Sequence, residues 1–119
     1  MTMLVLLMGH DHGGCEGGDG PPTQASCDPR LRWDNFGSGF MTHYCTTCHS
    51  SKVQGGQRRG APTDHDFDTQ DGVQMSLDHI DATAGKGPGS TNVCMPPYDP
   101  TPTDFEREQL ASWLACGAP

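Results

Sequence analysis

The run Cys45-Thr46-Thr47-Cys48-His49 combines two thiols and an imidazole at a spacing that can do chemistry. On a helical turn, two intervening residues place the cysteine sulfurs at the separation of the two vinyl groups of one porphyrin, where each sulfur can form a thioether. The histidine that follows projects toward the iron from the same side. The run occurs once, so it predicts a single covalently attached haem c on Cys45 and Cys48, with His49 as one iron ligand.

Two other kinds of site use cysteines at this spacing. A thioredoxin-like redox pair expects a βαβ context, which the surrounding sequence does not show. A zinc site needs a second pair of ligands at similar spacing, whereas Cys94, His65 and His79 are scattered along the chain. Both alternatives are weaker than haem attachment and stay open.

The second axial ligand of the iron must come from another segment, and Met95 is the leading candidate. Two prolines follow it directly, and they restrict the loop that would hold the sulfur in place. A thioether is a soft, neutral ligand that stabilises ferrous iron, and a His/Met pair raises the reduction potential. His65 or His79 could ligate instead, with a lower potential, or the sixth position could be open.

Helices must position these side chains. The first is expected after Asp34, a candidate N-cap, and it runs straight into the cysteine pair with Phe36, Phe40 and Tyr44 on one face. The second is expected as one helix over residues 73–84. No segment shows the alternation of a strand, so we expect an all-α fold with long loops.

The third helix carries the clearest signals. Thr103 and Glu106 have the spacing of a capping box, and Gly117 is a natural stop. Four apolar side chains form the expected inward stripe: Phe105, Leu110, Trp113 and Leu114.

The composition indicates one small domain with a thin core. The chain has 119 residues, of which 33% are hydrophobic, and it contains 16 glycines and 10 prolines. A porphyrin would give such a chain a large apolar body to pack around. The formal net charge of −8 argues against nucleic acid or an anionic membrane surface as a partner and suits docking to a basic patch on another protein.

The N-terminal segment resembles the leader of an exported protein. The first eight residues, MTMLVLLM, are apolar, and a glycine-rich acidic stretch follows Cys15. We therefore expect residues 1–26 to be a signal remnant, or a lipoprotein-like leader with a lipid on Cys15, followed by a flexible linker. The folded domain is expected over residues 27–119. Six cysteines in so short a chain favour an oxidising compartment or cofactor chemistry.

From about Trp33 to Cys116 the chain resembles the class I c-type cytochromes. The resemblance consists of an aromatic first helix entering the Cys-x-x-Cys-His run, a Gly-x-Pro loop ending at Pro62, a methionine loop and an aromatic last helix. It implies a cytochrome c fold, with three or more helices and long loops around one haem, whose first and last helices cross. It also implies that the Pro62 carbonyl accepts the second N–H of His49. Arg59, or its neighbour Arg58, could pair with a haem propionate.

Four cysteines remain outside the attachment run. If the first and last helices pack together, a bridge between Cys27 and Cys116 is reasonable, and we favour it. Pairings of Cys94 with either of these two are the competing arrangements. With Cys27 and Cys116 joined, Cys94 would be buried and free, or paired with Cys15 if that residue carries no lipid.

These features together imply a carrier of single electrons rather than an enzyme. It would use His/Met-ligated haem c, work in the periplasm or another exported location, and exchange electrons with redox proteins that present basic docking patches. The alternative is a haem-based catalytic or gas-binding module with an open or displaceable sixth ligand.

Overall fold

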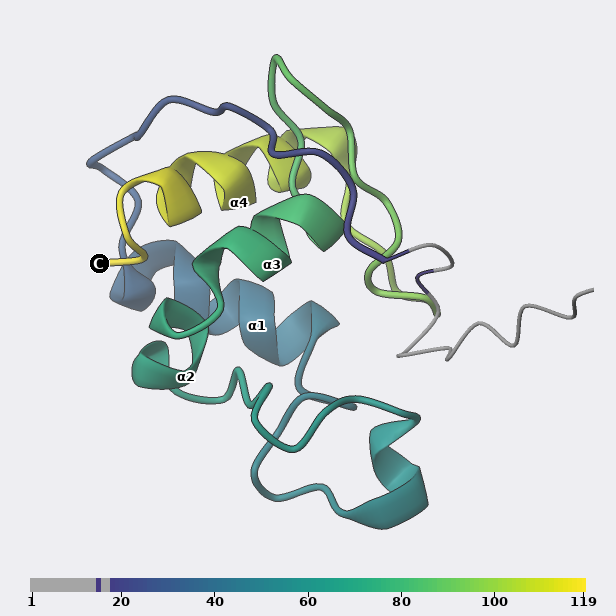
Figure 1. The fold of residues 1–119 in the computed structure, drawn as a ribbon. Coiled ribbons are helices and arrows are strands. Elements are labelled where there is room, and N and C mark those ends of the chain that lie inside the picture. Colours follow the sequence, from purple (N-terminus) through teal and green to yellow (C-terminus); the bar gives the residue numbers. More distant parts are fainter. Residues whose placement is uncertain (1–14, 16–17) are drawn as a thin grey trace, which may run out of the picture.

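The computed structural model describes Cys15 and residues 18–119. Within that part the regular elements are all helical, apart from an isolated bridge between Lys86 and Thr91, which confirms the all-α prediction. In chain order they are η1 (Trp33–Gly37, a π-helical turn), α1 (Ser38–Tyr44), η2 (Gly55–Arg58, a 3₁₀ turn), α2 (Gln70–Gln74), α3 (Leu77–Ala84) and α4 (Asp104–Ala115). Long loops join them (Figure 1).

The first helix begins two residues earlier than Asp34 suggested. Its N-cap is Arg32, whose backbone N–H donates to the side chain of Asn35 at 2.8 Å, so Asp34 lies inside the first turn. The predicted aromatic face is present. Phe36, Phe40 and Tyr44 follow one another with ring centroids 5.5 and 4.9 Å apart.

The first and last helices contact each other, as the resemblance implies. Trp113 of α4 is fully buried, stacks on Trp33 and meets the edge of Phe36. Gly37 makes this contact possible, because a Cβ there would fall inside the Trp113 indole. At Gly39 a Cβ would meet nothing within 4 Å.

The prediction of one helix over residues 73–84 is wrong. Two short helices, α2 and α3, occupy this stretch, and Ser76 between them has φ −135° and ψ 29°, which interrupts the helical path. Thr69 caps α2 by accepting the N–H of Gly72 at 3.1 Å. Val73 and Ile80 are buried as expected, whereas Met75 lies at the break and is 81% exposed.

The predicted capping box of α4 is confirmed. The Thr103 hydroxyl accepts the Glu106 N–H at 3.1 Å, and the Glu106 carboxylate accepts the Thr103 N–H at 3.0 Å. The inward face of α4 differs from the predicted apolar stripe at one position. Phe105 is 67% exposed, and Arg107 is buried on the inward face together with Leu110 and Trp113.

Two disulfides join segments far apart in sequence. The favoured bridge between Cys27 and Cys116 is present, with Cα atoms 4.8 Å apart. Cys15 pairs with Cys94, which is the arrangement expected if Cys15 carries no lipid. Of the leader and linker predicted over residues 1–26, residues 1–14, 16 and 17 lie outside the described part of the chain.

Residues 18–26, expected as flexible linker, lie against the domain in the structure. Gly20 N–H donates to the Ala82 carbonyl at 2.8 Å, and Thr23 is buried beside Asp81, whose carboxylate accepts its N–H at 2.9 Å. No helix among the described residues is long and apolar enough to cross a membrane.

Candidate cofactor site

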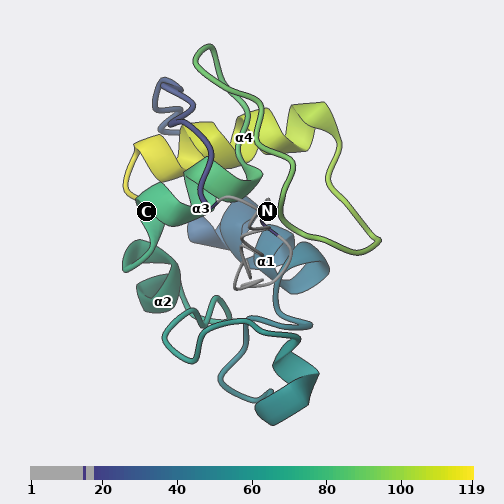
Figure 2. The ribbon, with the colours of Figure 1, turned by 45° about the vertical axis from the view of Figure 1, so that its right-hand side comes forward.

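A cavity opens beside the end of α1, and residues from five segments line it. Its empty space is about 860 Å³, counting the part open to solvent. The loop that carries η2 and the loop that follows α3 both extend away from the helices (Figures 1 and 2). The lining includes Cys45, Cys48, His49, Arg59 and Met95.

The backbone of the Cys-x-x-Cys-His run folds into a closed turn directly after α1. The N–H groups of Cys48 and His49 both donate to the Cys45 carbonyl, at 3.2 and 2.9 Å. Among the described cysteines, Cys45 and Cys48 are the free pair, since the other four form disulfides. Burial raises the pKa of Cys45 to about 12, although the nearby positive charge of Arg107 opposes that rise. The Cys45 thiol is therefore protonated, and Cys45 and Cys48 line one cavity.

The ring of His49 is held from two sides. Its Nδ1 lies 3.0 Å from the carbonyl oxygen of His65, and the ring stacks on Phe67 with centroids 4.7 Å apart. With the proton on Nδ1 donating to that carbonyl, the Nε2 lone pair is free to bind a metal. Burial lowers the pKa of His49, which favours this neutral form.

The carbonyl partner of His49 differs from the one that the resemblance implies. It belongs to His65, three residues beyond Pro62. The Pro62 carbonyl instead accepts a hydrogen bond from Nη2 of Arg58 at 2.6 Å, and Pro62 does not line the cavity. The chain folds a turn here, in which the His65 N–H donates to Pro62, so the carbonyl of His65 is the one brought to His49.

The two neighbouring arginines have different surroundings. Arg58 is 5% exposed, donates to five loop carbonyls and pairs with Asp66 at 2.8 Å, so it organises the loop between the attachment run and α2. Arg59 is exposed, lines the cavity and lies over the Tyr98 ring at 4.8 Å. Of the two guanidinium groups, that of Arg59 is the one available to an anionic group at the cavity mouth.

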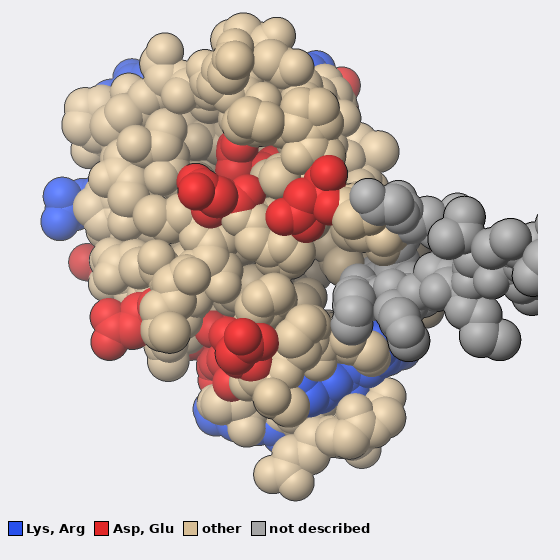
Figure 3. Space-filling model, viewed as in Figure 1, with Lys and Arg blue, Asp and Glu red and all other residues tan. Residues whose placement is uncertain are grey.

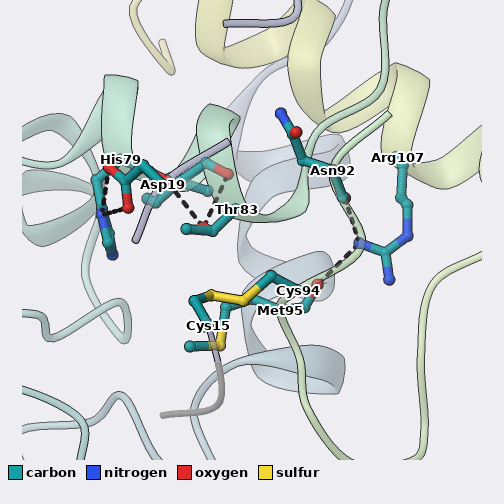
Figure 4. The surroundings of a disulfide bond; sticks show 9 residues. Cys15, Asp19, His79, Thr83, Asn92, Cys94, Met95 and Arg107 are labelled. Atoms are coloured by element: carbon teal, nitrogen blue, oxygen red, sulfur yellow. Dashed lines mark hydrogen bonds and ion pairs between the residues drawn. A yellow bond between two sulfur atoms is a disulfide. The ribbon is translucent and has the colours of Figure 1, made fainter. Parts of the chain in front are cut away.

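Met95 belongs to the same cavity as the attachment run, although 46 residues separate it from His49 in sequence. Its N–H donates to the Thr83 carbonyl at 2.9 Å, and its own carbonyl accepts from Arg107 Nη1 at 2.8 Å. Figure 4 shows Met95 next to the disulfide between Cys15 and Cys94.

The two histidines considered as alternative ligands lie in different places. His65 does not line the cavity and packs behind His49, with ring centroids 6.3 Å apart. His79 does line it, and its Nδ1 pairs with Asp19 at 2.9 Å.

The donor set can accommodate a covalently bound haem. Two free thiols, an imidazole with its second nitrogen positioned, and a thioether sulfur all line one cavity, which apolar side chains also line, among them Phe40, Phe67, Ile80 and Ala84. In the described part of the chain, no three His, Cys, Asp or Glu side chains are grouped to hold a metal ion, so the zinc alternative has no ligand set there.

Sequence reasoning missed several residues of the site. Phe67, the His65 carbonyl and Arg107 all act on the predicted ligands, but nothing in the spacing of the first two marks them. One signal was available in the spacing: Arg107 lies three residues before Leu110 in the last helix, so it falls on the same face as the apolar stripe.

Comparison with known proteins found no matching family model, no matching curated protein and no matching solved structure.

Proposed function

We propose that this chain is a monohaem c-type cytochrome that carries single electrons. The observation that supports the proposal most directly is the shared cavity, which is lined by both free thiols, the His49 imidazole and the Met95 thioether. A haem bound there would supply an iron that changes between the ferric and ferrous states by one electron.

The chain's own residues then have distinct tasks. Cys45 and Cys48 attach the group covalently, so it cannot dissociate during turnover. His49 is oriented by the His65 carbonyl and by stacking on Phe67, so its ring would be held ready to bind the iron. Met95 would provide a neutral, soft ligand, and a His/Met pair would favour ferrous iron relative to two histidines.

Arg59 has the position to bind a propionate. Its exposed guanidinium lies at the cavity beside Tyr98, whereas that of Arg58 is already bound to loop carbonyls and Asp66. A charge-assisted hydrogen bond from Arg59 would restrain the solvent-facing edge of the porphyrin.

The surface favours a basic redox partner. Asp and Glu side chains form several patches over the face shown in Figure 3, and the sequence carries a net charge of −8. Such a field speeds encounter with a positively charged partner and weakens as salt is added. The two disulfides are typical of an oxidising compartment, so we propose that the protein works after export.

The proposal is tested by a pyridine haemochrome assay on protein made in cells with a c-type maturation system. We expect one haem per chain and the spectrum of two thioether bonds. The Cys45→Ala and Cys48→Ala variants should each give a spectrum of one thioether bond, and the double variant should lose covalent haem. Colourless wild-type protein would refute the proposal.

A second measurement separates the carrier from a gas-binding or catalytic module. If Met95 holds the sixth position, carbon monoxide should leave the ferrous spectrum unchanged. A prompt shift on addition of the gas would favour the module with a displaceable ligand.

A further inference from the structure

We propose that Arg107, on the last helix, is a positioning residue that holds Met95 in place for iron ligation. This inference rests on the proposed function, because it concerns how the sixth ligand of that site is retained.

The guanidinium of Arg107 joins three points of the chain around the methionine. Its Nη1 lies 2.8 Å from the Met95 carbonyl oxygen, 3.1 Å from that of Asn92 and 3.0 Å from that of Ala84. Figure 4 shows the guanidinium facing the loop segment between Asn92 and Met95. One nitrogen thus connects the end of α3 with both ends of the segment that presents the sulfur.

The backbone of Arg107 adds a fourth connection. Its carbonyl accepts the N–H of Lys86 at 3.1 Å, at the start of the same loop. The last helix, α4, packs on α3 and on the aromatic first helix through Leu110 and Trp113. Arg107 therefore anchors the loop to the packed helices.

Other restraints on this loop act on different atoms: the Met95 N–H donates to Thr83, and Cys94 is bonded to Cys15. Between Gly85 and Thr103 the structure contains one isolated bridge and no helix. Backbone carbonyls in such a segment need donors when water is excluded, and Arg107 is the donor to those of Asn92 and Met95. Releasing it would leave the carbonyls of Asn92 and Met95 without that donor.

The burial of Arg107 indicates that this role is specific. The residue is 3% exposed, and in the described part of the chain no ion pair involves it. Burying a charge without a carboxylate partner is unfavourable unless its donors are satisfied. A packing role alone would be met by an uncharged side chain of similar length, so the cation points to the carbonyls that it binds.

The test measures how easily the methionine leaves the iron. Free imidazole displaces the sixth ligand of ferric haem, and its apparent affinity rises with the fraction of protein whose loop is open. We expect Arg107→Gln to raise that affinity about tenfold, and Arg107→Lys, which keeps the charge without the planar fork, to raise it by a smaller factor. Arg107→Lys also serves if Arg107→Gln does not fold.

Two controls distinguish positioning from general effects. Arg30→Gln removes the same charge from an exposed position, and Val73→Ala weakens the core in α2, away from the methionine loop. Both should bind imidazole as the wild type does. The inference would be overturned if the wild type and both Arg107 variants bound imidazole with equal affinity, or if Val73→Ala raised the affinity as much as the Arg107 variants do. The proposed function would survive either result, because the haem and its methionine ligand would still be present. Wild-type protein without haem would instead refute the function on which the inference depends.

Discussion

At the scale of single residues, the candidate site depends on groups that prepare the ligands before any metal is bound. The His65 carbonyl selects the tautomer of His49, and Phe67 fixes the plane of its ring. Removing such a partner usually lowers the affinity of the site for its metal, or its activity, by 10–100-fold. One of these two acts through its backbone, so substitution of the His65 side chain would leave its carbonyl in place.

The Met95→Ala variant should keep covalent haem but lose the low-spin His/Met state. The variant leaves in place the cysteines that would attach the haem and removes the proposed thioether ligand, so water or a weaker ligand would take the sixth position. We expect a high-spin ferric spectrum and new binding of carbon monoxide to the ferrous form. Met75→Ala is the matched control, because that methionine is 81% exposed and outside the cavity. A low-spin spectrum unchanged by Met95→Ala would show that another residue is the ligand.

At the scale of helices, the first and last elements meet through the aromatic contacts of Trp113, one close backbone approach and one polar contact. Gly37 lets the Trp113 indole lie against the backbone, and the Tyr44 hydroxyl donates to the Glu106 carboxylate at 2.7 Å. The close approach and the polar contact lie at opposite ends of α1, so together they fix how α1 lies beside α4.

Adding a methyl group at two glycines of the first helix should have opposite effects. Gly37→Ala would force a Cβ into Trp113, and we expect it to destabilise the fold by about 1–3 kcal/mol. Gly39→Ala meets open space and gains helix propensity, so it should stabilise by up to about 1 kcal/mol. Denaturant unfolding curves check both predictions: the midpoint should shift while the slope of the unfolding free energy against denaturant concentration stays that of the wild type. Equal destabilisation by the two variants would contradict the close contact with Trp113.

The contact between Tyr44 and Glu106 predicts a pH dependence. Hydrogen bonds from the Thr103 backbone and then from Tyr44 lower the pKa of Glu106 below its usual value of 4.5. A lowered pKa in the folded state gives stability that is present above the unfolded pKa and is lost as pH falls through the folded one.

Glu106→Gln should therefore reduce the loss of stability on acidification below about pH 4.5, because it has no proton to take up there. Urea unfolding midpoints measured from neutral to acid pH give the dependence of stability on pH. Glu108→Gln is the control, since that exposed carboxylate makes only a 3.6 Å ion pair with Lys86, which lies in the loop after α3. An acid limb identical to that of the wild type would contradict the prediction.

At the scale of the whole molecule, cross-links and a cavity take the place of a large core. Among the described residues, the fully buried large side chains are few, with Trp113, Met41 and Leu110 the largest. Small domains of this kind commonly depend on disulfides or a bound group for stability. Here the bridge between Cys27 and Cys116 fastens the segment before the first helix to the end of the last.

Removing that bridge should cost stability without changing the site. Its cysteines are 89 residues apart in sequence, and the chain-entropy account gives up to about 4.5 kcal/mol for a loop of that length. We expect the Cys27→Ala/Cys116→Ala variant to unfold at lower denaturant concentration while keeping the wild-type haem spectrum, because neither cysteine lines the cavity. An unchanged midpoint would show that the folded state is strained by the bridge or that the unfolded chain is already compact.

Local patterns in the sequence determined the features that depend on near neighbours. The capping box at Thr103, the aromatic face of the first helix and the all-α class follow from side chains three or four residues apart, where helix geometry alone decides the contact. The covalent haem and its ligands are likewise predictions from one short run and one methionine loop, and they remain to be measured.

Tertiary structure decided whatever depends on chain segments meeting. The break between α2 and α3 overrode an apolar periodicity that had indicated one helix. His65 rather than Pro62 faces His49 because a turn of the intervening loop brings that carbonyl inward. Arg107 is buried beside Met95 because the last helix packs against the methionine loop. Such contacts join residues that no local pattern relates, since packing and hydrogen-bond satisfaction are properties of the folded chain.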